Sequence, residues 1–337
     1  MTIVKTCGKL YWAGEYAILE PGQLALIKAI PIYMTAEIKA SNNYRLYSDM
    51  FSYSVDLRPD SSYTLIQETV ALVEEYLTAQ EVELQPFSLD VRGKMEREGK
   101  KFGLGSSGSV VVLVIKAMLA FYERLADREL LFKLASAVLL KRGDNGSMGD
   151  IACIVSEDLV LYQSFDREKV ADWLEKEELQ VVLDRDWGFS IRSVEPALKF
   201  DFLVGWTKEV AVSSHMVKQI KDNMNSSFLQ ASKETVANLV KDLEIGQEET
   251  IIDLLEQASQ LLEGLSSDIY TPSLRQLKNA SQDLKAVAKS SGAGGGDCGI
   301  ALGFDQDSTT LLKKRWADLG IELLYQERMG HDDKSEG

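Results

Sequence analysis

The chain has 337 residues, of which 45% are hydrophobic and 26% charged, and its formal net charge is −15. This composition is ordinary for a globular protein and the length suits two domains, while the negative charge argues against nucleic acid or an anionic membrane as a partner. No apolar stretch reaches the length of a membrane span, and the start MTIVKTCGKL lacks the apolar core of a signal peptide. Three cysteines without metal-ligand spacing suggest a reducing environment, so we expect a cytoplasmic protein.

The N-terminal part of the chain begins with predicted strands. β-Branched and aromatic residues are frequent at 3–10 and 26–40, which predicts two strands, and a hairpin is expected within 44–56. Apolar residues at helical spacing predict an amphipathic helix over 62–79, and another strand is expected at 87–91.

A cluster of small residues follows in KKFGLGSSGSVVVLVIKAMLAFYERL, residues 100–125. Gly103, Gly105 and Gly108 match the G-x-G-x-x-G pattern of dinucleotide sites and, with Val110, the glycine loop of protein kinases. A dinucleotide site needs a strand that runs directly into the loop, but the charged segment RGKMEREGKK intervenes. A protein kinase needs H-R-D downstream, and neither histidine of this chain precedes Arg-Asp. Neither interpretation holds.

The remaining interpretation is physical. The loop opens directly into a helix predicted over 107–125, so its free N–H groups and the helix dipole favour an anion. Glycine permits close approach of a phosphate to the backbone, and the serines add hydroxyl groups. A core helix with serine caps is the alternative, and the loop alone does not decide between them.

Two further motifs carry polar residues at predicted boundaries. GKLYWAGEYAILEPG contains Lys9, which by itself would be read as a surface lysine. After a helix predicted over 128–141, DNGSMGDIACIV places Asp150 at the start of a strand predicted over 151–156, paired in a hairpin with 159–163. Alone, Asp150 would be read as a turn aspartate.

A second unit begins near residue 200. Strands are predicted at 202–206, 299–304 and 321–326, and helices at 215–225, 229–264, 274–289 and 308–319. Helix and strand alternate, which indicates an α+β sandwich. The polar end HDDKSEG is expected to be disordered.

A second glycine cluster, SSGAGGGDCGIAL, occupies residues 290–302. A flexible linker is a poor explanation, because the cluster lies between a predicted helix and a predicted strand and few residues follow it. The glycines therefore serve close approach to a ligand or to another segment of backbone. We favour the ligand over a purely structural turn.

Together these stretches resemble the GHMP kinase superfamily, which includes galactokinase, homoserine kinase, mevalonate kinase and phosphomevalonate kinase. GKLYWAGEYAIL resembles the N-terminal substrate motif, GLGSSGS the ATP loop and SGAGGGDCGIAL the C-terminal glycine motif, in the family's order. Within the family the sequence is most similar to the bacterial phosphomevalonate kinases. Tyr16 stands where mevalonate kinases usually have His, and Asp297 where they usually have Gly. The stretch GWTKEVAVSSHMV resembles W-T-G-x-x-A-S-T, although Lys208 and Ser214 depart from it.

The resemblance implies an α+β, two-domain GHMP-kinase fold. Residues 1–198 would form an ATP-binding domain of the ribosomal-protein-S5-like type, residues 199–330 a ferredoxin-like α/β sandwich, and 331–337 a disordered tail. It also implies Mg²⁺-assisted transfer of phosphate from ATP to 5-phosphomevalonate. A mevalonate kinase on the same scaffold is the alternative, and a non-catalytic nucleotide sensor is disfavoured because Lys9 and Asp150 are both present. The oligomeric state is left open.

The resemblance also assigns site residues. Lys9 and Asp150 would be catalytic, Asp150 either as a base or as a charge that positions Lys9. The residues expected to bind ATP are Lys101, Gly103, Leu104, Gly105, Ser106, Ser107, Gly108 and Ser109, with Ser107 near Mg²⁺. The residues expected to bind the acceptor are Tyr16, Ser147, Ser213, Ser291, Ala293 and Gly294.

One feature departs from the family pattern. Mevalonate kinases carry a Mg²⁺-binding Glu on the helix before the catalytic Asp, but residues 130–142 of this chain contain no acid. The sequence therefore leaves the second protein ligand of the metal unassigned.

Overall fold

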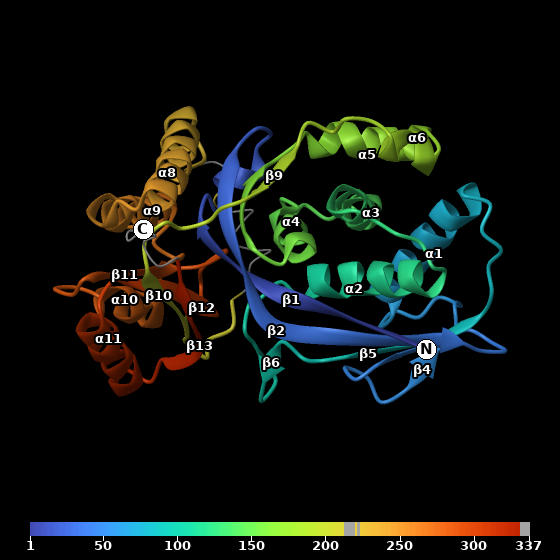
Figure 1. Cartoon of the computed structure of the whole chain (residues 1–337), viewed down its shortest axis with the longest axis horizontal. Helices are drawn as coiled ribbons and strands as arrows, with labels where there is room; N and C mark the ends of the chain where they lie inside the picture. Colours follow the sequence, from blue (N-terminus) through green and yellow to red (C-terminus); the bar gives the residue numbers. More distant parts are fainter. Residues whose placement is uncertain (212–219, 221–222, 331–337) are drawn as a thin grey trace, which may run out of the picture.

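Two main sheets organise the chain in a computed structural model, which describes residues 1–211, 220 and 223–330 (Figure 1). The predicted acceptor residue Ser213, most of the helix predicted over 215–225 and the predicted tail 331–337 lie outside the described residues. None of the helices in the described part is both long and apolar enough to cross a membrane.

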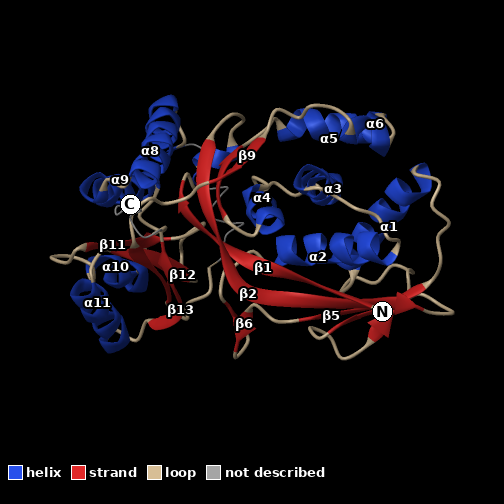
Figure 2. Cartoon of the chain, in the orientation of Figure 1, coloured by secondary structure: helices blue, strands red, loops and turns tan. Residues whose placement is uncertain are grey.

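The N-terminal half is built on a seven-stranded sheet with the order β4-β3-β5-β2-β8-β9, and β1 pairs with β2. Its strands are β1 (Thr2–Ala13), β2 (Leu24–Ala40), β3 (Arg45–Ser48), β4 (Ser54–Val55), β5 (Phe87–Arg92), β8 (Leu159–Gln163) and β9 (Ser190–Ser193). The long strand β2 pairs with β8 near its start and with β5 near its end, so it connects the two parts of the sheet (Figure 2). A short hairpin, β6 (Glu96–Arg97) and β7 (Lys100–Lys101), precedes the first glycine cluster.

Helices cover one face of this sheet (Figure 1). They are α1 (Thr64–Ala79), α2 (Ser106–Phe121), α3 (Arg128–Lys141) and α4 (Gly149–Ser156), with α5 (Arg167–Lys176) and α6 (Leu179–Leu183) beyond them, while η1 (Ala17–Leu19) follows β1. The apolar run that opens at Ser106 is buried almost all round, because α2 packs between the sheet and the outer helices.

The C-terminal half has a four-stranded antiparallel sheet with the order β11-β12-β10-β13. The strands are β10 (Phe200–Trp206), β11 (Ala286–Ser290), β12 (Cys298–Gly303) and β13 (Glu322–Met329), and the helices are α8 (Ser226–Ile245), α9 (Glu248–Leu265), α10 (Pro272–Asn279) and α11 (Gln306–Asp318). This βαββαβ order confirms the predicted ferredoxin-like sandwich. The chain leaves the first sheet at Ser193 and enters the second at Phe200, on either side of the predicted domain boundary.

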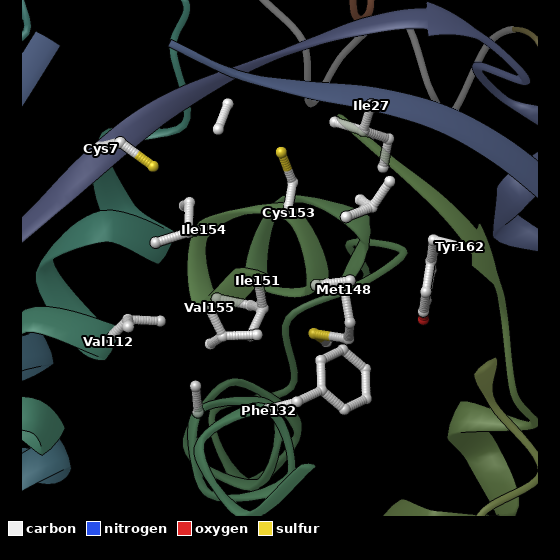
Figure 3. Packing of buried hydrophobic residues seen from close by; sticks show 14 of the residues in the cluster. Cys7, Ile27, Val112, Phe132, Met148, Ile151, Cys153, Ile154, Val155 and Tyr162 are labelled. Atoms are coloured by element: carbon white, nitrogen blue, oxygen red, sulfur yellow. The ribbon is translucent and has the colours of Figure 1, made fainter. Parts of the chain in front are cut away.

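Two predicted elements are wrong. The stretch 151–156, predicted as a strand, is part of helix α4. Figure 3 shows the reason: residues 151–155 of α4 are buried among side chains from β1, β2, α2, α3 and β8, so they form a short continuous apolar run that does not distinguish a helix from a strand. The helix predicted over 274–289 ends at Asn279, and its last part is strand β11, which is buried throughout.

A buried ion pair joins the two halves. Lys289 Nζ lies 2.6 Å from Glu15 Oε1, and the two side chains are 1% and 3% exposed. The same ammonium group donates to the Ser290 carbonyl at 2.6 Å. Beside this pair, the end of β1 packs on the second sheet, where the rings of Trp12 and Phe202 lie 5.2 Å apart. The halves are therefore fixed to each other by both charge and apolar packing.

We expect Lys289→Met to lower the free energy of unfolding by about 3–5 kcal/mol, because it leaves the Glu15 carboxylate buried without its partner. Combining it with Glu15→Gln should restore part of the loss. Urea unfolding of the single and the double variant measures this, with Lys285→Met as the control, since that lysine is largely exposed and lies 3.9 Å from Glu248. Equal losses in the Lys285 and Lys289 variants would contradict the role of the pair.

Candidate functional site

The glycine–serine loop, residues 103–109, lies directly against strand β1. The backbone N–H of Lys9 donates to the carbonyl of Leu104 at 2.9 Å. A Cβ atom on Gly8 would lie 2.8 Å from the Cβ of Leu104, so glycine is needed here for the strand and the loop to meet. The regular pairing of β1 with β2 is interrupted between Thr6 and Gly8, next to this contact. As a result, the side chain of Lys9 lies over Gly105 of the loop.

Three glycines of the loop are each covered by one charged side chain: Gly103 by Asp297, Gly105 by Lys9 and Gly108 by Asp150. A Cβ on any of the three would lie 2.5 to 2.8 Å from the side chain above it, closer than real Cβ contacts. Gly103 and Gly105 also have φ of 77° and 78°, in the left-handed region that favours glycine. The glycines therefore make room for charged side chains of the protein itself.

The loop ends at the N-terminus of α2. The first helical hydrogen bond runs from Ser109 N to the Gly105 carbonyl at 3.1 Å, so the N–H groups of 106–108 have no partner within the helix. Ser107 is exposed and Ser106 half-buried at this end. Unpaired donors and the positive end of the helix dipole favour an anion here.

Two predicted ATP-binding side chains point elsewhere. The hydroxyl of Ser109 is fully buried and donates to the Cys7 carbonyl of β1 at 2.7 Å, on the side of α2 that faces the sheet. The side chain of Leu104 is 1% exposed and belongs to the core. Only the backbone of Leu104 is therefore available to a ligand at the loop. The prediction was wrong for the hydroxyl of Ser109, because spacing along the chain does not show which serines of a helix turn face inward.

Lys9 and Asp150 influence each other electrostatically. Burial raises the pKa of Asp150, while the ammonium group of Lys9 and the Ile151 N–H, 2.9 Å from Oδ1, lower it. Lys9 Nζ lies 5.2 Å from the centroid of the Tyr11 ring. Among the described residues no ion pair joins Lys9 and Asp150, so the predicted pair is one of electrostatic proximity.

The loop before Asp150 is fixed by tyrosines. Met148 has a left-handed φ of 63° immediately before α4 begins, which directs Asp150 toward the glycine–serine loop. The Ser147 hydroxyl shares a hydrogen bond of 3.0 Å with the hydroxyl of Tyr11, and the Ser147 carbonyl accepts from Tyr162 Oη at 2.9 Å. Gly149 leaves room for the Tyr11 hydroxyl.

Three predicted acceptor residues meet across the two halves. Tyr16, with φ of 64°, donates its hydroxyl to the Ala293 carbonyl at 2.5 Å. Ser291 Oγ donates to the Tyr11 carbonyl at 2.9 Å. Since Tyr11 also contacts Ser147 and lies under Lys9, it connects the predicted acceptor residues with the predicted catalytic lysine.

The second glycine cluster is explained partly by backbone packing. A Cβ on Gly294 would lie 2.5 Å from the Ile269 carbonyl oxygen, and one on Gly296 would lie 2.8 Å from that of Glu209. These two glycines allow the backbone to approach other segments closely, as expected for a structural turn. Gly292 faces open space, so it keeps the form expected for ligand approach. A role of Gly294 in binding the acceptor stays a prediction for its N–H group.

Tyr11 and Arg167 were not among the predicted site residues. Arg167 Nη1 donates to the carbonyls of Asn145 and Gly146 at 2.6 Å each, and its Nη2 donates to that of Leu19 at 2.7 Å. It therefore ties the loop before Asp150 to the segment after Tyr16. No local signal marks such an arginine, because its partners are backbone atoms far away in the chain.

The oxygen groups at the loop suit a hard cation. No cluster of three or more His, Cys, Asp or Glu that could hold a metal occurs in the described residues. The acid of α3, Glu129, pairs with Lys133 at 2.7 Å. The hydroxyls of Ser106 and Ser107 and the carboxylates of Asp150 and Asp297, which lie over Gly108 and Gly103, are oxygen groups at the loop. They fit Mg²⁺, which keeps several waters and needs few protein ligands when phosphates supply the rest.

Comparison with known proteins gives two family matches. Residues 64–157, from α1 to α4, match the model of the GHMP kinases N terminal domain. Residues 239–322 match the model of the GHMP kinases C terminal domain.

Individual relatives cover nearly the whole chain. The structure of Streptococcus pneumoniae phosphomevalonate kinase in complex with phosphomevalonate and AMPPNP is 73% identical, with a TM-score of 0.97, and the match covers 98% of this chain and 100% of that one. The Listeria innocua protein Lin0012 is 30% identical, with a TM-score of 0.91 and 97% of each chain covered. The phosphomevalonate kinase of Streptomyces sp. (strain CL190) is 28% identical over 357 residues, which covers 95% of each chain.

We expect Gly105→Ala to weaken binding of the ATP analogue AMPPNP at least about tenfold, equivalent to about 1.4 kcal/mol, because its Cβ displaces Lys9. Isothermal titration calorimetry measures the dissociation constant. Gly188→Ala is the control, since Gly188 has a similar φ of 80° but open space around its Cβ. Both variants carry the same backbone strain, so unchanged affinity in Gly105→Ala would show that Lys9 does not depend on this glycine.

We expect Asp150→Asn to be more stable than the wild type at neutral pH. Burial raises the pKa of Asp150 above its unfolded value, so the folded state loses stability as pH rises through the raised pKa, and asparagine does not ionise. Urea unfolding at several pH values should show the gain at pH 7 shrinking as the pH falls. Asp305→Asn is a control of opposite sign, because the Ser308 N–H lowers the pKa of that exposed carboxyl. A gain for Asp150→Asn that grows toward low pH would refute the assignment.

Proposed function

The chain belongs to the GHMP kinase family, and from that premise we propose that it transfers the γ-phosphoryl group of ATP to phosphomevalonate. The products are ADP and diphosphomevalonate. The observation that carries the proposal is the convergence of free N–H groups, Lys9 and two carboxylates on one glycine–serine loop. The choice of acceptor rests on the 73% identical kinase that binds phosphomevalonate and AMPPNP.

The glycine–serine loop would hold the phosphates of ATP. Backbone N–H groups from Gly103 to Gly108 would donate to phosphate oxygens, and the Ser106 and Ser107 hydroxyls would add further contacts. Lys101, exposed on β7 beside the loop, would supply positive charge. Ser107 would hold Mg²⁺, which when bound neutralises phosphate charge and orients the phosphates.

The acceptor would lie where the two halves meet. Tyr16, Ser147, Ser291, Ala293, the N–H of Gly294 and Ser213 are the residues proposed to surround it. Tyr11 and Arg167 would keep the loops that carry these residues in place.

The acceptor chemistry suggests what Asp150 does. A phosphate monoester has a second pKa of about 6, so at pH 7.5 the acceptor is mostly a dianion and no proton needs to be removed. A phosphate oxygen of the acceptor attacks the γ-phosphorus while the bond to the departing ADP oxygen breaks. Catalysis is then mainly positioning and charge stabilisation, with Lys9 beside the transferring group and Asp150 orienting Lys9.

A cytoplasmic location completes the proposal. Cys7, Cys153 and Cys298 are all buried and unpaired, as a reducing compartment favours. Both proposed substrates are small anions, which suits an enzyme without a membrane or nucleic-acid partner.

The test is a coupled assay of ADP release with Mg²⁺ and ATP, with phosphomevalonate or mevalonate as the acceptor. We expect release with phosphomevalonate, a diphosphate signal of the product in phosphorus NMR, and a rate at least about a hundredfold lower with mevalonate. Lys9→Met should lose most of the activity. Phosphorylation of mevalonate in place of phosphomevalonate would overturn the proposed acceptor.

A further inference from the structure

Asp297 follows the three consecutive glycines of the second glycine cluster and is held in an unusual backbone conformation. Its φ is 53°, in the left-handed region that non-glycine residues seldom adopt. The Asp297 N–H donates to the Glu209 carbonyl at 2.8 Å, and the Asp297 carbonyl accepts from the N–H and Oγ1 of Thr207 at 2.9 and 2.8 Å. Strain of this kind persists where surrounding bonds fix a residue in place.

The side chain of Asp297 contacts two separate segments. Its Oδ1 accepts from the Ala211 N–H at 3.3 Å. Its Oδ2, Cγ and Cβ lie on Gly103, within 2.5 to 2.8 Å of where a Cβ would stand. One carboxylate therefore joins the second glycine cluster, which carries Ser291 and Ala293, to the loop proposed to bind ATP.

The surroundings of this carboxylate are charged. Burial raises the pKa of Asp297, and the Ala211 N–H, Lys9 and Lys101 lower it. The same two lysines are the cations proposed to meet the phosphates of ATP. A polyphosphate bound at the loop therefore interacts with the same lysines whose positive charge stabilises the Asp297 carboxylate. Because Asp297 belongs to the second glycine cluster, the bound polyphosphate also influences that cluster.

We propose that Asp297 is a positioning residue that couples the two substrate subsites. Its carboxylate holds the second glycine cluster against Gly103 of the glycine–serine loop, two residues before Gly105, which Lys9 covers. The inference rests on the proposed function, because that function assigns ATP to one side and the acceptor to the other. Its consequence is that each substrate binds more tightly when the other is bound.

The experiment measures the dissociation constant of AMPPNP with Mg²⁺ by isothermal titration calorimetry, with and without saturating phosphomevalonate. The ratio of the two constants is the coupling factor. We expect a factor of at least about fivefold in the wild type, the lower end of usual coupling between sites, and close to one in Asp297→Asn. Affinity for AMPPNP alone should change less than the coupling factor, since asparagine keeps the size of the side chain.

Glu209→Gln is the matched control. Glu209 is an acid whose backbone carbonyl accepts from the Asp297 N–H, while its carboxylate accepts from Thr271 and Ser273 at 2.9 and 2.8 Å. This variant should keep the wild-type coupling factor. Gly103→Ala presses on the Asp297 carboxylate from the opposite side and should lower the coupling factor even if Asp297→Asn folds poorly.

Three outcomes would overturn the inference. The first is an unchanged coupling factor in Asp297→Asn, and the second is independent binding of the two ligands to the wild type. The third is weaker Mn²⁺ binding to the AMPPNP complex of Asp297→Asn, measured by electron paramagnetic resonance, with coupling retained, which would make Asp297 a metal ligand. If the wild type does not bind phosphomevalonate at all, the proposed function fails instead.

Discussion

The contact between strand β1 and the glycine–serine loop at Gly8 is the constraint on which the site depends. It brings the Lys9 backbone within hydrogen-bonding distance of Leu104 and directs the lysine side chain over Gly105. Asp150 and Asp297 then approach the same loop from α4 and from the second glycine cluster. A larger residue at position 8 would move the strand away from the loop. Lys9, Asp150 and Asp297 would then no longer contact the same loop.

The site is assembled from locally unfavourable parts. Tyr16, Met148 and Asp297 are non-glycine residues with positive φ, and each lies on a segment that borders the site. Burial also raises the pKa of both aspartates. Such strain and desolvation persist because Tyr11, Tyr162 and Arg167 hold the loop before Asp150 and the segment after Tyr16, while Thr207 and Glu209 hold Asp297. The same features explain why groups that oppose stability remain at the place where charge is needed.

Sequence reasoning predicted the two halves, most strands and both glycine clusters, because turn residues and β-branched runs are local signals. It missed helix α4 and strand β11, because residues 151–155 form a short continuous apolar run and every residue of β11 is buried, so neither shows the period of its element. It named Lys9 and Asp150 through family motifs, but it expected a hydroxyl of Ser109 that in fact faces Cys7. Tyr11, Arg167 and the contact of Asp297 with Gly103 depend on residues distant in the chain, which no local pattern encodes.

The ion pair of Glu15 and Lys289 has a consequence for the order of events during synthesis. The partners are 274 residues apart, so a ribosome that adds about 5–20 residues per second needs tens of seconds between them. During that interval the growing chain holds Glu15 and Tyr16 without the partners that complete their surroundings. The proposed acceptor side therefore forms only when nearly the whole chain has left the ribosome. A newly synthesised chain can therefore become catalytically active only after nearly all of its residues have been added.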